Sequence, residues 1–203
     1  EKDARRFIKR INPKKDQSSL QLYPLNKFTS PEEILTYLDP IQEGITMGVI
    51  SDAGCPGVAD PGAEIVKMAH RKNIVVRPLV GPSSILLALM SSGLNGQNFA
   101  FVGYLPQEPQ ERTRRIKELE QLALKTGQTQ LFIETPYRNL ALWGSLVQSL
   151  QTQTRLAFSS GITLPDSMNQ SATIQQWRKT RPANGDGPDG LSNQTPAVFS
   201  IGA

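Results

Sequence analysis

The sequence has very little cysteine and histidine, with one residue of each, and this scarcity excludes several classes of site. A single cysteine, Cys55, excludes an internal disulfide. With only one histidine beside it, the sequence argues against a zinc site built from protein ligands, so we expect no bound metal. No apolar run approaches the roughly 20 residues of a membrane-spanning helix. No charged and then apolar leader of a secreted protein is evident either, so we expect the reducing cytoplasm and no membrane partner.

What remains is an ordinary globular composition, with 38% hydrophobic and 20% charged residues in 203. That length allows one large domain or two small ones. The net charge of +4 is modest but unevenly placed. Basic residues crowd the first 15 positions and recur at 112–117, where they can contact phosphate groups or simply form solvated helix faces.

Strand-like and helix-like patterns alternate along the chain, which indicates an α/β fold with a mainly parallel sheet. Two α/β domains are expected, residues 1–81 and 82–203, and a cleft between such domains is a usual place for a small-molecule site. Strands are expected at 20–25, 45–51, 74–79, 99–104, 129–134, 155–158 and 195–201. Helices are expected at 3–10, 31–41, 63–72, 85–90 and 109–125 and after Thr135, with a mobile loop at 181–194.

The stretch VISDAGCPGVADPG, residues 49–62, is the most informative motif. An apolar strand ends abruptly in small residues, two carboxylates and two prolines, as in loops at the carboxyl end of a sheet where open α/β folds bind ligands. Gly54 and Gly57 allow a ligand to approach the backbone. Asp60 and Pro61 resemble an N-cap followed by proline in the first helical turn. A turn-rich strand–helix connection without a ligand explains the same pattern.

Two further small-residue loops, 81–84 and 103–106, are expected to open into the same cleft. These loops, in this order, resemble the class III methyltransferases, or tetrapyrrole methylase superfamily, and most closely its ribosomal RNA small-subunit methyltransferase I family. The motifs that carry the resemblance are SDAGCPGVADPG (51–62), VGPSS (80–84), FAFVGYLP (99–106) and FIETPYR (132–138). The resemblance implies S-adenosylmethionine (SAM) in the cleft between the domains, methylation of a cytidine ribose 2′-oxygen in small-subunit ribosomal RNA, and a homodimer.

By similarity, two groups of residues line the cofactor site. Those in the first two loops are Asp52, Ala53, Gly54, Val58, Asp60, Ser83 and Ser84. Those for the adenine are Tyr104, Thr195, Pro196 and Ala197. Methyl transfer from a sulfonium rests mainly on positioning and exclusion of water and needs no metal. No general base is identified; Asp52 and Glu134 are the carboxylates expected at strand ends facing the cleft, and hydrogen bonding within loops is their alternative role.

Two departures from the family pattern keep other readings open. Family members begin with a strand and a proline- and glycine-containing loop that has no counterpart here, and SSGITLPDSMNQS (159–171) replaces an acidic segment. One alternative is a methyltransferase for a small tetrapyrrole-like substrate. Another is a catalytically silent module that binds SAM or a nucleotide. The basic clusters favour the RNA methyltransferase, with ribosomal RNA or the small ribosomal subunit as partner.

Overall fold

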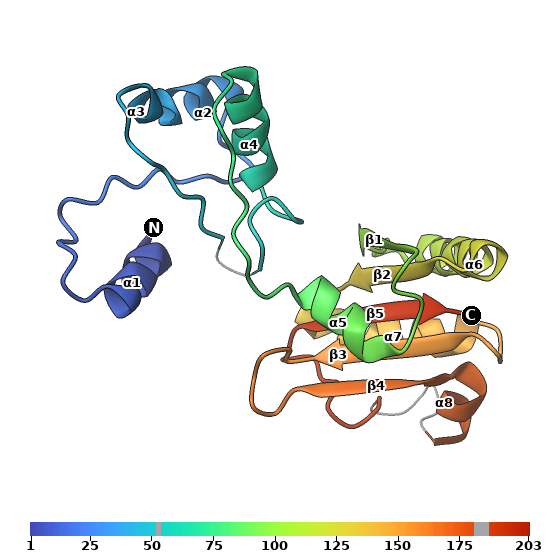
Figure 1. The fold of residues 1–203 in the computed structure, drawn as a ribbon. Helices are drawn as coiled ribbons and strands as arrows, with labels where there is room; N and C mark the ends of the chain where they lie inside the picture. Colours follow the sequence, from blue (N-terminus) through green and yellow to red (C-terminus); the bar gives the residue numbers. More distant parts are fainter. Residues whose placement is uncertain (52–53, 181–186) are drawn as a thin grey trace. The chain divides into compact units, whose positions relative to one another are not determined.

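The computed structural model describes residues 1–51, 54–180 and 187–203. The chain divides into two compact units, Glu1–Pro82 and Ser83–Ala203, which we describe separately (Figure 1). No helix among the described residues is both long and apolar enough to cross a membrane.

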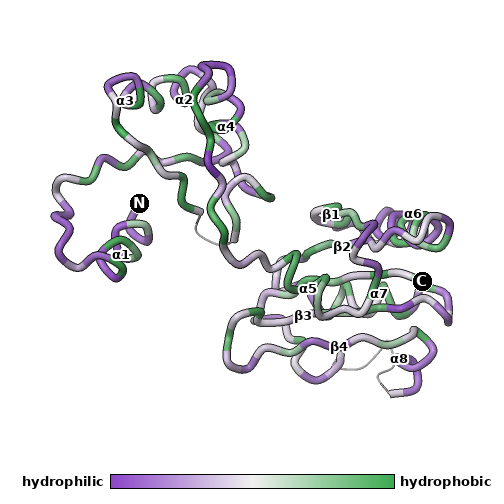
Figure 2. Tube along the Cα trace, in the orientation of Figure 1, coloured by the Kyte–Doolittle hydropathy of each residue, from purple (hydrophilic) through white to green (hydrophobic). Residues whose placement is uncertain are grey.

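The described part of the amino-terminal unit is built from helices. They are α1 (Lys2–Ile11), α2 (Pro31–Tyr37), α3 (Asp39–Gln42) and α4 (Gly62–Arg71). Its small core joins Ile34, Tyr37 and Leu38 to Ile65, Met68 and Ala69 of α4. The predicted cap of α2 is present, because the Ser30 hydroxyl accepts the Glu33 N–H at 3.1 Å. Helix α1 buries no residue and is mostly hydrophilic, with hydrophobic positions interspersed (Figure 2).

The strands predicted at 20–25, 45–51 and 74–79 are wrong, since none of these segments is a strand in the structure. The alternation behind the prediction is partly present: Ile74 and Val76 pack against the helical core, while Val75 is exposed. Alternating β-branched residues favour an extended backbone, but a strand also needs a neighbour that pairs with its N–H and C=O groups. Within residues 1–51, 54–180 and 187–203, none of these three segments pairs with another strand.

The carboxyl-terminal unit contains a five-stranded sheet in the order β1-β2-β5-β3-β4. The strands are β1 (Phe99–Tyr104), β2 (Thr129–Ile133), β3 (Arg155–Ser160), β4 (Met168–Thr173) and β5 (Ala197–Gly202). Only β1 and β2 are parallel, and the other three pairings are antiparallel. The α/β class is confirmed, but the mainly parallel sheet is wrong, because β5 inserts between β2 and β3 in the opposite direction.

Helices cover both faces of this sheet (Figure 1). Helix α5 (Ser84–Ser92) packs on one face, where Ala88 and Leu89 contact Leu131 and Val198. The other face, which carries Phe132, packs against α6 (Pro109–Thr126), α7 (Asn139–Ser149) and α8 (Ile174–Thr180). Neighbouring residues of β2 thus enter different cores, as the two-residue period of a strand requires. A 3-10 turn, η1 (Pro136–Arg138), leads from β2 into α7.

Three aromatic rings form the centre of the larger core. The Trp143 ring lies edge-on to Trp177 and to Phe158, with centroids 5.0 and 5.9 Å apart. Trp143 is buried, as its place on the apolar stripe of α7 predicts. Trp177 is also buried, and its indole N–H donates to the Leu156 carbonyl at 2.9 Å. Trp177 therefore serves the core, and its polar atom is satisfied.

This core predicts a large difference between two chemically identical substitutions. Leu146→Ala removes a fully buried side chain of α7 and should lower the free energy of unfolding by about 2–5 kcal/mol. Leu124→Ala, on the exposed side of α6, should cost below about 1 kcal/mol. Urea denaturation followed by tryptophan fluorescence measures both, and equal losses would contradict the described core.

Candidate functional site

One edge of the carboxyl-terminal sheet gathers the ends of four strands. Tyr104, the last residue of β1, is level with Ile133 at the end of β2, and Ile133 is level with Val198 of β5. Ala197 at the start of β5 pairs with Ser160 at the end of β3. Since β5 runs antiparallel to β2 and β3, its beginning meets their ends. Tyr104 and Ala197 are both predicted to contact the adenine and are 93 positions apart in the sequence. Through these pairings they lie at the same edge of this sheet.

The predicted serines begin the helix that covers this sheet. Ser83 is the N-cap of α5 through its backbone, whose carbonyl accepts the Leu87 N–H at 2.9 Å, and its side chain makes no capping bond. Ile85, two residues later, packs against the same small core as Phe101 of β1 and Ile133 of β2. Ser84, between them, is exposed. Helix α5 itself packs mainly over β5, β3 and β4.

Glu134, a candidate catalytic carboxylate, directly follows β2 and is almost completely buried. Its Oε1 atom accepts the Thr135 N–H at 2.7 Å, the Thr135 hydroxyl at 3.1 Å and the Arg138 Nη2 at 2.6 Å. Its Oε2 atom is buried and has no hydrogen-bond partner among the described residues. These contacts stabilise the turn from β2 into η1. Hydrogen bonding within a loop is the role that the sequence offers for Glu134 as an alternative to catalysis. A catalytic role for Glu134 stays a prediction.

Asn139 is a contributor that sequence reasoning missed. Its side-chain amide donates to the Ser192 and Thr195 carbonyls, both at 2.9 Å, and thereby holds the residues just before β5. The available signal was a polar residue on an otherwise apolar helical stripe, followed by Leu142, Trp143 and Leu146. Its partners lie more than 50 residues away, so no local pattern identifies them.

The predicted loop of the amino-terminal unit is organised by Asp60; Asp52 and Ala53 lie outside the described residues. The Asp60 carboxylate accepts the Ser51 hydroxyl at 2.8 Å, the Gly57 N–H at 3.1 Å and the Gly62 N–H at 2.8 Å. A Cβ at Gly62 would stand 2.9 Å from the backbone nitrogen of Gly57, as well as 2.7 Å from Asp60 Oδ1, so the loop requires a glycine there. The cap prediction needs correction, because Pro61 is the N-cap of α4 and Asp60 bonds across the loop instead.

These contacts also change the acidity of Asp60. Partial burial alone would raise the pKa of the carboxyl group, but the hydrogen bonds from Gly57, Ser51 and Gly62 outweigh it, and the pKa lies below its ordinary value. Two other residues predicted in this loop, Gly54 and Val58, are exposed. The loop therefore has a rigid anionic anchor with exposed residues around it.

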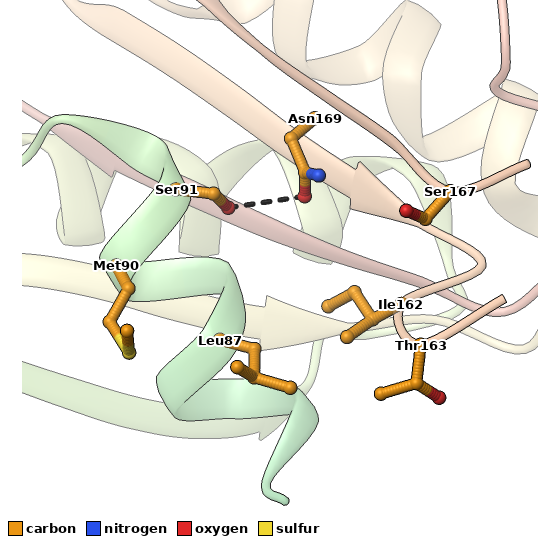
Figure 3. Close-up of a pocket in the computed structure, with 7 residues that line it drawn as sticks. All are labelled: Leu87, Met90, Ser91, Ile162, Thr163, Ser167 and Asn169. Atoms are coloured by element: carbon orange, nitrogen blue, oxygen red, sulfur yellow. Dashed lines mark hydrogen bonds between the residues drawn. The ribbon is translucent and has the colours of Figure 1, made fainter. Parts of the chain in front are cut away.

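A pocket of about 430 Å³ lies beside α5 in the carboxyl-terminal unit (Figure 3). Ser91 and Asn169, which both line it, are joined by a hydrogen bond of 3.1 Å (Figure 3). The Ser91 hydroxyl also lies 3.0 Å from the hydroxyl of Ser159. None of its lining residues is charged, so the pocket suits a neutral group with both apolar and hydrogen-bonding surfaces. They are Leu87, Met90, Ser91, Ile162, Thr163, Ser167 and Asn169.

No residue of this pocket belongs to the predicted cofactor set. Within the part of the chain that the structure describes, no group of three or more histidine, cysteine, aspartate or glutamate side chains is placed to hold a metal ion.

Comparison with known proteins gives consistent sequence matches. The chain is 33% identical over 139 residues to ribosomal RNA small subunit methyltransferase I of Thermotoga maritima, covering 68% of this chain and 60% of that protein. It is 37% identical over 125 residues to that of Leptospira borgpetersenii (61% and 47%), and 37% identical over 101 residues to that of Halalkalibacterium halodurans (50% and 34%). The chain thus spans about a third to three fifths of the length of these relatives. No family model matches.

Solved structures support the fold independently. The methyltransferase CobJ superposes with a TM-score of 0.57 at 15% identity, covering 93% of this chain and 77% of CobJ. The cobalt precorrin-4 methyltransferase CbiF superposes with a TM-score of 0.50 at 17% identity, covering 87% and 72%. At this level of identity the likeness concerns the fold alone.

The Asp60 network predicts a pH-dependent loop. Because the pKa of Asp60 is lowered on folding, its carboxylate stabilises the loop above the unfolded pKa of about 3.9, and that contribution is lost as the pH falls through the folded value. In hydrogen exchange followed by NMR, the Gly57 and Gly62 amides should be protected at neutral pH and less protected in Asp60→Asn. Asp39→Asn, an exposed carboxylate of the same unit, is the control and should leave both amides unchanged.

The Glu134–Arg138 pair predicts an asymmetric mutational response. Glu134→Ala leaves the largely buried Arg138 guanidinium without its partner and should cost about 3–5 kcal/mol of unfolding free energy. Replacing both residues by apolar ones (Glu134→Leu with Arg138→Met) should recover much of that loss. Glu118→Ala, which breaks exposed pairs on α6, should cost below about 1 kcal/mol. Equal losses in all three variants, measured by urea denaturation, would refute the structural role of Glu134.

Proposed function

We propose that the chain is a class III SAM-dependent methyltransferase, of the tetrapyrrole methylase superfamily, and that it methylates a cytidine ribose 2′-hydroxyl in small-subunit ribosomal RNA. The observation that carries the proposal is the repeated sequence match to ribosomal RNA small subunit methyltransferase I from several bacteria, at 30–37% identity. The strand ends gathered at one sheet edge support it.

The residues at that sheet edge fit a sulfonium cofactor in their chemistry. Gly103 has a φ of +73°, and apart from its chain neighbours no atom of the described residues lies within 4 Å of where its Cβ would be, so a ligand can approach this backbone closely. The guanidinium of Arg138 is already paired with Glu134, which limits its repulsion of a positive sulfonium. Tyr104 offers an exposed ring and hydroxyl, and Thr195, Pro196 and Ala197 offer peptide groups suited to an adenine.

In this proposal the protein contributes positioning rather than covalent chemistry. SAM, when bound, supplies an electrophilic methyl group, and the chain holds the attacking ribose oxygen in line with it and excludes water. Asp60 keeps its loop in one conformation. Ser83 and Ser84, at the start of α5, contribute to the cofactor site. The base that takes the ribose proton is not assigned. If Glu134 acts, it would do so through its Oε2 atom, which is buried and has no partner among the described residues, because its Oε1 atom already accepts three hydrogen bonds.

The distribution of positive charge favours a polyanionic substrate. Lys2, Lys9 and Arg10 are exposed on α1, whereas Asp3 is paired with Arg6. Phosphate groups of RNA would find these cations accessible. The cluster on α6 contributes less, because Arg112 is buried against Ser145 and the Gln107 carbonyl, while Arg114 and Arg115 share Glu118. We therefore place the RNA contact on α1 rather than on α6.

The same proposal includes two properties that follow from the family resemblance. The active form would be a homodimer. Action on ribosomal RNA would place the protein in the cytoplasm.

Calorimetry with SAM, followed by transfer of tritiated methyl groups to undermethylated small ribosomal subunits, tests the function. We expect binding and transfer, and Tyr104→Ala should weaken SAM binding about tenfold through loss of one ring contact. Phe28→Ala, which removes an exposed aromatic of the amino-terminal unit, serves as the control and should bind as the unmodified protein does.

Each other result excludes a specific part of the proposal. Binding without transfer to any RNA would favour the silent module, and transfer to a tetrapyrrole instead of RNA would favour the small-molecule enzyme. Absence of SAM binding would overturn the proposed function altogether.

A further inference from the structure

Asn139 makes two hydrogen bonds that join distant parts of the carboxyl-terminal unit. It is the first residue of α7 and is fully buried. Its Nδ2 atom lies 2.9 Å from the Ser192 carbonyl oxygen and 2.9 Å from that of Thr195. A single amide NH₂ group thus uses both of its hydrogens on one turn.

Other contacts fasten the same turn from two sides. The Leu140 N–H donates to the Asn193 side chain at 3.1 Å, and the Gly161 N–H, just after β3, donates to the Pro196 carbonyl at 3.0 Å. Asn193, Gln194 and Pro196 are themselves exposed and contribute little to the core. In residues 195–197, the 195–197 segment, Ala197 is held by the core and by its pairing in β5, whereas Thr195 and Pro196 depend on hydrogen bonds from their neighbours.

At position 139 of α7, burying an apolar side chain would cost less free energy than burying an asparagine. Leu142, Trp143 and Leu146 follow at helical spacing and are all fully or almost fully buried. An amide in such surroundings costs free energy unless it is hydrogen-bonded, and its Oδ1 atom has no partner among the described residues. The two hydrogen bonds from Nδ2 offset this cost, because they satisfy both N–H groups of the amide and the two carbonyl oxygens of the turn.

We infer that Asn139 is a positioning residue for the cofactor: it holds the 195–197 segment in its binding conformation before the cofactor arrives. The inference rests on the proposed function, in which this segment contacts the adenine. Preorganisation of this kind acts on affinity, because a disordered segment must be ordered at the moment of binding. Asn139 touches neither reacting atom in this account, so the rate at saturating SAM should not depend on it.

The test compares Asn139→Leu with Thr154→Val in the whole protein. Thr154 is also buried, and its hydroxyl donates to the Glu120 carboxylate. Thr154 directly precedes Arg155, the first residue of β3, which pairs with Gly202 at the opposite end of the sheet from Ala197. Both variants lose buried hydrogen bonding, but only Asn139→Leu releases the turn. Calorimetry with SAM should show about tenfold or greater weakening for Asn139→Leu and below about twofold for Thr154→Val.

Kinetics separate positioning from a general structural role. For Asn139→Leu, the KM for SAM should rise while kcat at saturating SAM and the KM for RNA stay within about twofold of the unmodified protein. A loss of stability alone would instead lower the apparent kcat in proportion to the unfolded fraction, or weaken apparent SAM binding by no more than that fraction accounts for, and circular dichroism measures this fraction on the same samples.

Asn139→Asp provides a second variant, because it keeps the shape of the side chain. Its carboxylate cannot donate, but the protonated acid can donate one hydrogen bond to the turn. Its SAM affinity relative to the unmodified protein should therefore rise as the pH is lowered. Equal affinities of Asn139→Leu and Thr154→Val, or a relative affinity of Asn139→Asp that does not vary with pH, would overturn the inference alone. Failure of the unmodified protein to bind SAM would overturn the proposed function, and the inference with it.

Discussion

The insertion of β5 between β2 and β3 is the constraint on which the carboxyl-terminal unit depends. All six residues of β5 are buried, and they pair with β2 on one side and β3 on the other. Side chains of β5 alternate between the two cores, so Val198 packs under α5 and Phe199 packs against the other helices. Because β5 runs against both neighbours, its first residue must lie beside their last ones. With the observed registers, this pairing brings Glu134, Ser160 and Ala197 to one edge, and the parallel pairing of β1 with β2 adds Tyr104.

The turn before β5 shows how this edge is completed. The residues before β5 are held by hydrogen bonds. The groups that donate them come from the connection between β2 and α7. Glu134 stabilises the first half of that connection through Thr135 and Arg138, and Asn139 in the second half reaches across to the turn. The buried polar groups of this region therefore serve conformation at the site, at a cost in burial that an apolar core would avoid.

Local sequence patterns predicted much of the carboxyl-terminal unit. The bounds of β1 agree with the predicted 99–104, and α6 begins at Pro109 as predicted. Strand β4 and helix α8 were not predicted, because MNQSAT lacks an apolar alternation and IQQWRKT is too short to show a helical stripe. The direction of β5 was not predictable either, since it is decided by pairing with strands that lie elsewhere in the chain.

In the amino-terminal unit the patterns predicted the helices but also strands that are not formed. Ser30 and the residues after it identify α2 correctly, because capping is a local interaction. Residues 74–79 have the alternation of a strand but no pairing partner, and pairing cannot be inferred from alternation alone. Family-like loops predict Tyr104 and residues 195–197 as cofactor residues; the sheet brings Tyr104 and Ala197 to one edge, and their role there stays a prediction. The hydrogen bonds of Asn139 could not be predicted, because they depend on tertiary structure.

Hydrogen–deuterium exchange with and without SAM tests the central claim most directly, namely that the strand ends gathered by β5 form the cofactor-binding edge. Peptides that cover 103–106 and 192–196 should exchange more slowly with SAM present, while peptides from the exposed face of α6 should not change. Slowing elsewhere in the chain, with both edge peptides unaffected, would contradict the account.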